Sequence, residues 1–253
     1  MSRTVIHLHE VDSTNEYIKR CAQQLPDRAV VYSDHQTSGK GRLGRVWEDA
    51  PEESMLASWM LKGISGQPLQ LLPFVAGVSV LDALDSFGAE CALKWPNDLL
   101  APVAGGYKKV GGILCESRPV EGFAVCGIGV NLLQDQRSFL QSGLQDATSI
   151  AQAFGCKLDR ESLIERISQF IDQWIGQAGK DSSVLLESVQ LRCVTLGTQV
   201  RILTGQGEMT GLAKAIGEQG ELICQTENGE MKVCAGDVSV RGLYGYTQKK
   251  EGD

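Results

Sequence analysis

Apolar residues recur through the first two thirds of the chain with two different spacings. Continuous apolar runs of strand length that end in polar residues or turns are typical of buried strands. Helical spacing of apolar residues predicts two helices, one at 68–87 and one at 158–178. The second is expected to be capped by Asp159. A mixed sheet flanked by helices is therefore expected, with strands at 28–36, 54–61, 91–100, 109–116 and 123–133.

Another helix is predicted near the amino terminus. Ser13 followed by Glu16 has the form of a capping box, in which a hydroxyl starts the helix and a carboxylate follows three residues later. This helix is expected to run from about Asn15 towards Gln24.

The pattern changes near Val194. From there to Gly242 the helical spacing disappears, and short alternating runs separated by glycines replace it. Asn228-Gly229 indicates a hairpin with a type I′ turn. The change predicts a large domain over 1–192, a small β-barrel domain over 193–246 and a polar tail over 247–253.

Composition narrows the classes of function. The 253 residues are 42% hydrophobic with a net charge of -7, which argues against general binding to nucleic acid or to an anionic membrane. No two of the eight cysteines have the spacing CxxC, so neither a zinc ribbon nor a dithiol redox motif is indicated. No apolar run is long enough for a signal peptide or a membrane span. A cytoplasmic protein is expected.

One short segment is locally cationic. The sequence QTSGKGRLGRVW at 36–47 places Lys40, Arg42 and Arg45 among glycines, which suits binding of a phosphate or carboxylate. A solvated surface hairpin would have the same composition, so both interpretations stand at this point. The segment lacks the P-loop pattern, and the residues after its glycines do not indicate the helix that a Rossmann motif requires.

Two further segments place polar residues or glycines inside expected strands. The sequence KWPND at 94–98 lies within the 91–100 run, where these residues are unusual unless the strand is interrupted to present polar groups. A turn at a strand end explains the segment equally well. Gly111-Gly112 follows Lys109, and paired glycines in a strand indicate the close approach of a ligand or of another backbone.

Five segments, in this order and at these distances, resemble the catalytic domain of biotin protein ligases. They are Asp12-Ser13-Thr14-Asn15, Gln36 with Gly39 to Trp47, Lys94 to Asp98, Lys109 to Glu116, and Gly127-Ile128-Gly129-Val130-Asn131. The resemblance extends over about residues 5–243, because the stretch that ends at Arg241 is similar to the small SH3-like domain of that family. It implies an α+β fold, with a class II synthetase-like mixed sheet flanked by helices and then an SH3-like β-barrel.

The resemblance also implies a reaction. Biotin and ATP, with Mg²⁺, would form biotinyl-5′-AMP, and the biotinyl group would pass to a lysine of a biotin carboxyl carrier protein. Two anions meet in the first step, so fixed cations would stabilise the charge that develops on the phosphorus oxygens. By resemblance, Lys109 and Arg42 are the catalytic residues, and Asp98 is the metal ligand.

The binding residues are implied in the same way. The biotin side comprises Ser13, Thr14, Asn15, Gln36, Gly39, Lys40, Gly41, Arg42, Trp47, Lys109 and Gly112. The nucleotide side comprises Arg42, Arg45, Trp47, Lys94, Asn97, Asp98, Asn131 and Arg241. Lys40 stands where arginine is frequent in the family, so the charge is kept while the bidentate geometry is lost.

Several alternatives stay open on the sequence alone. A lipoate or octanoyl ligase or transferase shares the fold, and a non-catalytic biotin or nucleotide sensor would be expected to lack Lys109 or Arg42. An adaptor that acts through residues 194–242 alone is a third alternative. No winged helix is expected ahead of Val5, so neither operator binding nor any other nucleic-acid partner is expected. Homodimerisation through an exposed sheet edge is left open.

Overall fold

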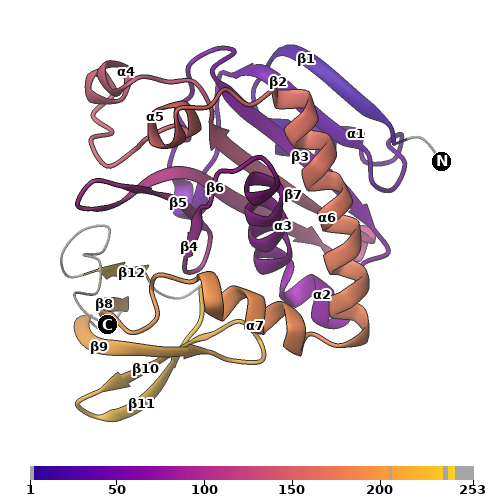
Figure 1. The fold of residues 1–253 in the computed structure, drawn as a ribbon. Coiled ribbons are helices and arrows are strands. Elements are labelled where there is room, and N and C mark those ends of the chain that lie inside the picture. Colours follow the sequence, from indigo (N-terminus) through magenta and orange to yellow (C-terminus); the bar gives the residue numbers. More distant parts are fainter. Residues whose placement is uncertain (1–2, 205–206, 236–238, 243–253) are drawn as a thin grey trace.

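Two β-sheets form the frame of the molecule in the computed structural model, which describes residues 3–204, 207–235 and 239–242. The strands of the large sheet are β1 (Val5–Val11), β2 (Val30–Gln36), β3 (Ser54–Lys62), β4 (Ala92–Lys94), β5 (Asp98–Val103), β6 (Gly106–Arg118) and β7 (Phe123–Asn131). Their order across the sheet is β1-β2-β3-β7-β6-β5-β4 (Figure 1). The β1–β2 pair is parallel and the other pairs are antiparallel, so the expected mixed sheet is confirmed.

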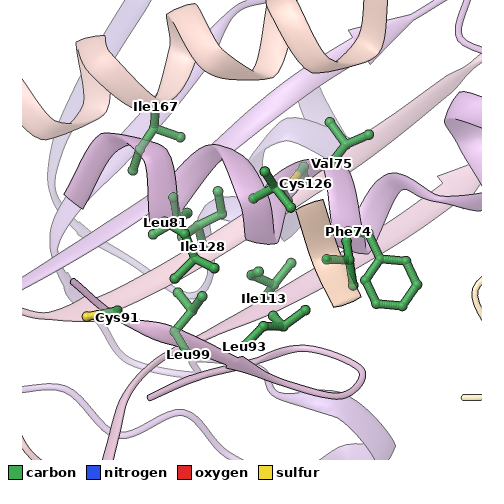
Figure 2. Close-up of a cluster of buried hydrophobic side chains, with 14 of the residues drawn as sticks. Phe74, Val75, Leu81, Cys91, Leu93, Leu99, Ile113, Cys126, Ile128 and Ile167 are labelled. Carbon is green, nitrogen blue, oxygen red and sulfur yellow. The ribbon is translucent and has the colours of Figure 1, made fainter. Parts of the chain in front are cut away.

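Helices cover both faces of this sheet. On one face, α1 (Thr14–Cys21) packs against β2, β3 and β7. On the other, α3 (Leu72–Ser86) packs against β6 and β7, and α6 (Arg160–Lys180) packs against α3 and β3. Figure 2 shows the apolar side chains that meet between α3 and the sheet, among them Leu81 of α3 and Ile113 and Ile128 of the strands, all of which are buried. The main core therefore lies on the α3 face, and a smaller cluster around Ile18 lies under α1.

The remaining elements of the large unit are short or lie near its carboxyl end. They are α2 (Gly66–Gln70), α4 (Gln136–Gln141), α5 (Ile150–Phe154), α7 (Ser183–Arg192) and the single 3₁₀ turns η1 (Arg42–Gly44) and η2 (Pro119–Glu121). Among the described residues, none of the helices is long and apolar enough to cross a membrane.

The 91–100 run is not one strand. Its two parts, β4 and β5, are antiparallel neighbours joined by a turn at 95–97, with Lys94 opposite Asp98. The prediction of a single strand is therefore wrong, and the turn interpretation of KWPND is confirmed. Pro96 cannot donate a ladder hydrogen bond, which is consistent with its place in the turn and not in either strand.

The helix predictions need two corrections. The expected helix at 68–87 is divided, because Leu71 leaves helical geometry (φ -91°, ψ 10°) between α2 and α3. Ser13 is the residue before α1, but its side chain makes no capping hydrogen bond, so the capping box is absent. By contrast, the Asp159 cap is confirmed, since its carboxylate accepts a hydrogen bond from Ser162 N at 2.8 Å.

The small sheet is antiparallel throughout. Its strands are β8 (Gln199–Thr204), β9 (Gly207–Ile216), β10 (Leu222–Thr226), β11 (Gly229–Val233) and β12 (Ser239–Gly242), in the order β11-β10-β9-β8-β12. A hairpin joins β10 to β11 as expected, but the positive φ of 106° falls on Gly229 and not on Glu227 or Asn228, so the turn is not type I′. The predicted tail at 247–253 lies outside the described residues.

The two sheets are in contact through buried side chains. Trp95, in the turn between β4 and β5, is 2% exposed and donates from Nε1 to the carbonyl oxygen of Gly220 at 3.0 Å. The α7 helix also packs against β9 and so links the two units. The division into domains at residue 192 stays a prediction.

Candidate functional site

Glycines hollow out the face of the large sheet that α1 covers. Along β7, Val125 fills this face beneath α1, whereas the next residues that point to it are Gly127 and Gly129. A Cβ atom added to Gly127 would lie 2.3 Å from Asn15 Oδ1, and one added to Gly129 would lie 2.7 Å from the Trp47 ring. Glycine is therefore required at both positions by the close approach of other side chains.

A cavity lies over these glycines at the amino-terminal end of α1. Its open volume is about 60 Å³, because the Trp47 ring and the segment that carries it occupy the space above the sheet. The cavity brings together residues that the sequence predicted for both ligands. Its lining comprises Ser13, Thr14, Asn15, Gln36, Lys40, Trp47, Leu56, Asn97, Lys109, Gly112, Ile113, Leu114, Gly127, Ile128 and Gly129.

Neutral polar groups that line the cavity are fixed in place by hydrogen bonds. Thr14 N and Thr14 Oγ1 both donate to Gln36 Oε1, at 2.8 and 3.1 Å. Ser58 Oγ lies 2.7 Å from Thr14 Oγ1 and 2.6 Å from Asn15 Oδ1. Asn15 Nδ2 in turn donates to Glu116 Oε2 at 2.8 Å. Such an arrangement of donors and acceptors suits a neutral polar ligand better than an ion.

The glycine-rich segment 36–47 forms a small hairpin over the cavity, which we call the cationic hairpin. Gly41 N donates to Arg45 O at 2.8 Å, and Trp47 N donates to Gly39 O at 2.9 Å. A Cβ atom on Gly39 would lie 2.4 Å from Trp47 O, so the hairpin can close only with glycine there. The segment is therefore a hairpin, but its basic residues are not simply solvated, because Lys40 pairs with Glu16 and Arg42 donates to Asn97.

The tip of the cationic hairpin has an unusual backbone. Leu43 adopts φ 56° and ψ 37°, and Gly44 follows with φ 73°. Left-handed geometry is uncommon for a residue with a side chain, and such residues concentrate in turns, ligand clamps and switch regions. The Leu43 side chain is 66% exposed, so no packing of its apolar atoms offsets this conformation.

Trp47 lies inside the cavity. A Cβ atom on Gly112 would lie 3.1 Å from its ring, and Lys109 Nζ is 5.6 Å from the ring centre. Its Nε1 atom is buried and has no hydrogen-bond partner. The ring therefore covers the floor of the cavity and does not belong to either apolar cluster, and its N–H group is available to an acceptor.

Two further cations lie at or beside the cavity: Lys109 lines it, and Arg42 belongs to the cationic hairpin over it. Lys109 Nζ pairs with Asp98 Oδ1 at 2.7 Å. Arg42 Nη1 donates to Asn97 Oδ1 at 3.0 Å, and its Nη2 contacts the carbonyl oxygen of Ala235 beyond β11. Burial lowers the pKa of the Arg42 guanidinium, although a group of this kind stays protonated. A desolvated cation of this kind interacts strongly with an incoming anion.

Lys40 uses its charge differently. Its Nζ atom pairs with Glu16 Oε1 at 2.6 Å and so ties the cationic hairpin to α1. Lys19 also pairs with Glu16, at 2.7 Å, and with Glu116, at 2.8 Å. Hydrogen bonds from Lys19 and Lys40 lower the pKa of Glu16. The structure thus pairs Lys40 with a carboxylate at the cavity rim.

Several predicted residues do not line the cavity. Gly39, Gly41 and Arg42 belong to the cationic hairpin around it, and Asp98 reaches it only through Lys109. Arg45 is exposed, and Lys94 lies on β4.

Asn131 and Arg241 are a separate case. Asn131 is buried at the end of β7, and its Nδ2 atom donates to the carbonyl oxygen of Thr148 at 3.1 Å. The backbone of Arg241 lies in β12, but its side chain lies outside what the structure describes. The roles assigned to these residues stay predictions.

Sequence reasoning missed part of the lining. Leu56 and Leu114 contribute apolar surface, and nothing in their sequence context distinguishes them from core residues. Ser58 could have been found from the sequence, because it is a hydroxyl residue within an apolar strand. In the structure it is 0% exposed. Buried polar atoms need partners, and Ser58 finds them in two predicted site residues.

The fold and the site define a class of protein: an enzyme domain with a mixed sheet whose hollow is covered by a cationic hairpin, joined to a second β domain that reaches the hairpin. Residues 8–132 match the model of the biotin/lipoate A/B protein ligase family, and residues 195–241 match the biotin protein ligase C-terminal domain. The chain belongs to the biotin/lipoate A/B protein ligase family.

Individual relatives agree with this assignment. The chain is 30% identical to "Bifunctional ligase/repressor BirA" of Bacillus spizizenii over 250 residues, which cover 95% of this chain and 75% of that one. It is 31% identical to "Biotin--[acetyl-CoA-carboxylase] ligase" of Paracoccus denitrificans, over 93% of this chain and 100% of that one. The solved structure of the biotin protein ligase from Aquifex aeolicus in complex with biotin and ATP matches with a TM-score of 0.81 and 30% identity, over 95% of this chain and 100% of that chain.

Proposed function

We propose that this chain is an ATP-dependent biotin protein ligase, which forms biotinyl-5′-AMP and transfers biotin to a lysine of a biotin carboxyl carrier protein. One observation carries the proposal: a single cavity is lined both by neutral polar groups, among them Thr14 and Gln36, and by the cation of Lys109. Biotin has the same division, since its ureido ring is neutral and its valerate chain ends in a carboxylate. The Aquifex aeolicus relative, whose structure contains biotin and ATP, supports the same conclusion.

The residues of the chain have distinct tasks in this proposal. Thr14, Asn15 and Gln36 bind the ureido ring through hydrogen bonds, and Trp47 covers the ring system. Lys109 is placed to hold the biotin carboxylate against the α-phosphate of ATP, so that a carboxylate oxygen attacks phosphorus and pyrophosphate leaves. Arg42 adds positive charge from the cationic hairpin. Cations fixed before the reaction stabilise the charge that builds on the phosphorus oxygens without reorganising.

The donor set beside Lys109 is compatible with Mg²⁺. Asp98 presents a carboxylate, of which Lys109 contacts one oxygen, and Asn97 lies in the adjacent turn. Mg²⁺ binds one or two protein carboxylates and takes its other ligands from substrate phosphates and water. Asp98 would hold the ion, which when bound neutralises part of the triphosphate charge.

Transfer of the biotinyl group to the acceptor lysine requires that water be excluded, because biotinyl-5′-AMP is a mixed anhydride that water hydrolyses. The cationic hairpin covers the cavity and is tied to α1 by the Lys40–Glu16 pair and to the small sheet by Arg42. It therefore encloses the intermediate until an acceptor lysine arrives.

Exchange of labelled pyrophosphate into ATP tests the first step. We expect exchange that depends on biotin, with lipoate supporting far less, because the polar groups around Thr14 would be left without a ureido partner. Folded protein that shows no biotin-dependent exchange in the presence of Mg²⁺ contradicts the proposal. Exchange with lipoate in place of biotin favours the lipoate ligase alternative.

Arg42→Gly tests the cationic hairpin separately. The variant loses the contacts to Asn97 and Ala235, so we expect adenylate to form at a reduced rate and to leave the enzyme before transfer. Released biotinyl-5′-AMP would label lysines of unrelated proteins such as albumin, which can be measured with streptavidin. Arg118→Gly is the matched control, because Arg118 is half exposed and pairs with Glu121 at the end of β6, outside the cavity lining. Full retention of the intermediate by Arg42→Gly would refute this role.

A further inference from the structure

A second cluster of chemically active side chains lies at the edge of the large sheet. The chain has three histidines, and two of them, His7 and His9, lie two residues apart on β1, the outermost strand. Residues at this spacing point to the same face of a strand. Asp34 on the neighbouring strand β2 faces both: His7 Nε2 is 2.8 Å from its Oδ1 atom and His9 Nδ1 is 3.0 Å from its Oδ2 atom.

The surroundings of the cluster hold its members in place. The His7 ring stacks on the Tyr32 ring with a centroid distance of 4.6 Å and an interplanar angle of 6°. Arg160, at the start of α6, donates to Asp34 Oδ1 at 2.6 Å. Contacts with three side chains, His7, His9 and Arg160, therefore fix the position of the Asp34 carboxylate.

We propose that His7 Nε2, His9 Nδ1 and Asp34 Oδ2 form a binding site for a divalent first-row transition metal ion such as Zn²⁺. These three side chains each offer a ligand atom, and the atoms lie within 4.8 Å of one another. Ligands placed about 2.0–2.2 Å from a zinc ion are separated by distances in this range. Among the residues that the structure describes, no other group of three metal-ligating side chains meets this criterion.

The donor set selects the class of metal. Two imidazole nitrogens and one carboxylate oxygen suit Zn²⁺, Ni²⁺, Co²⁺ or Cu²⁺, whereas Mg²⁺ and Ca²⁺ require oxygen donors. The site is therefore distinct from the position proposed for Mg²⁺ at Asp98. His9 is 92% exposed, so solvent would complete the coordination shell.

Arg160 is the main opposing feature, because it places a positive charge beside the carboxylate. It contacts Oδ1, however, and leaves Oδ2 to His9. A carboxylate that binds a metal through one oxygen commonly accepts a hydrogen bond on the other, which orients the ligand. The same charge lowers affinity, so we expect weaker binding than in a closed structural site.

Calorimetric titration of the full chain with Zn²⁺ tests the site. We expect one saturable equivalent, and His9→Gln should lower its affinity by about tenfold or more, the loss that even an outer partner of a metal ligand causes. The side chain of His9 is so exposed that this change leaves the fold intact, which a melting curve verifies. His35→Gln is the matched control, because the third histidine pairs with Asp49 Oδ2 at 2.9 Å outside the cluster.

The chain has eight cysteines, and none of those in the structure is in a disulfide, so thiols must be distinguished as ligands. Co²⁺ in place of Zn²⁺ does this, because thiolate ligation gives intense charge-transfer absorption and nitrogen and oxygen ligation does not. Weak visible bands alone, lost in His9→Gln, would support the site. Thiolate absorption, no saturable binding, or equal affinity in His9→Gln and the parent would overturn it.

Discussion

The two faces of the large sheet differ in what fills them. On the α3 face, large apolar side chains of the strands, such as Ile113 and Ile128, are covered by the 15-residue helix α3, against which α6 packs (Figure 2). On the α1 face an 8-residue helix covers only part of the surface. Gly127 and Gly129 leave a hollow at the amino-terminal end of this helix. One strand, β7, contributes to both faces. Core and binding site are therefore separated by side-chain alternation along the same strand, and a substitution on one face should leave the other nearly unchanged.

The largest expected effect is on the α1 face. Lys109→Ala removes a cation that lines the cavity and is proposed to hold the biotin carboxylate, so we expect adenylate formation to fall about 100- to 1,000-fold, as for loss of a preorganised group that stabilises the transition state. Biotin-dependent pyrophosphate exchange measures it. Lys108→Ala is the control, because Lys108 does not line the cavity and its Nζ atom lies 3.4 Å from Gln136 Oε1. A loss below about fivefold, or 1 kcal/mol, would exclude a catalytic role.

On the α3 face the effect should be on stability. Leu81 is 0% exposed, and Leu81→Ala is expected to reduce the free energy of unfolding by about 2 to 5 kcal/mol through lost burial and a residual cavity. Denaturant unfolding measures this, with kcat/KM for biotin unchanged in the fraction that stays folded. Leu140→Ala serves as the comparison, since Leu140 is 53% exposed and should change stability by less than about 0.5 kcal/mol. Loss of activity in folded Leu81→Ala would show that the faces are coupled.

Much of the α3 face could be predicted from the sequence, because its signal is local. Apolar periodicity identified the buried strands and α6, whose Asp159 cap is also visible in the sequence. The strand β1 was not predicted, since His7, His9 and Glu10 interrupt its apolar pattern at an edge that is largely solvent-exposed. The missing capping box at Ser13 has a different cause. Glu16 is used by Lys19 and Lys40, a contact between distant segments that local spacing cannot reveal.

The site was predicted in part, through resemblance and not through periodicity. Thr14, Gln36 and Lys109 are far apart in sequence, and the pairing of β2 with β3, β3 with β7 and β7 with β6, with α1 packed on these strands, brings them together. Composition also left open whether the glycines at 39 and 41 approach a ligand. In the structure they approach the returning arm of their own hairpin, a fact that depends on the fold of the hairpin.

Gly127→Ala should affect the site while the core remains intact. The added Cβ atom would lie 2.3 Å from Asn15 Oδ1 and force this side chain from its hydrogen bonds. We expect the KM for biotin to rise about tenfold, which corresponds to about 1.4 kcal/mol, with a smaller change in kcat. Gly176→Ala is the matched control, because a Cβ there meets nothing within 4 Å and lies in α6. An unchanged KM for Gly127→Ala would show that Asn15 does not contact biotin.

The smallest expected effect concerns the tie between α1 and the cationic hairpin. Glu16→Gln removes the partner of Lys40 but leaves Lys19 paired with Glu116, so α1 keeps one ion pair to the sheet. A partly exposed pair contributes about 0.2 to 1 kcal/mol, so biotin should dissociate at most about fivefold faster, which stopped-flow tryptophan fluorescence can follow. Because the pKa of Glu16 is lowered in the folded state, the tie is present above the usual glutamate pKa and is lost as pH falls through the folded value. Glu10→Gln, on exposed β1, should leave the rate unchanged. A rate equal to the parent's in Glu16→Gln would mean that Arg42 alone holds the hairpin closed.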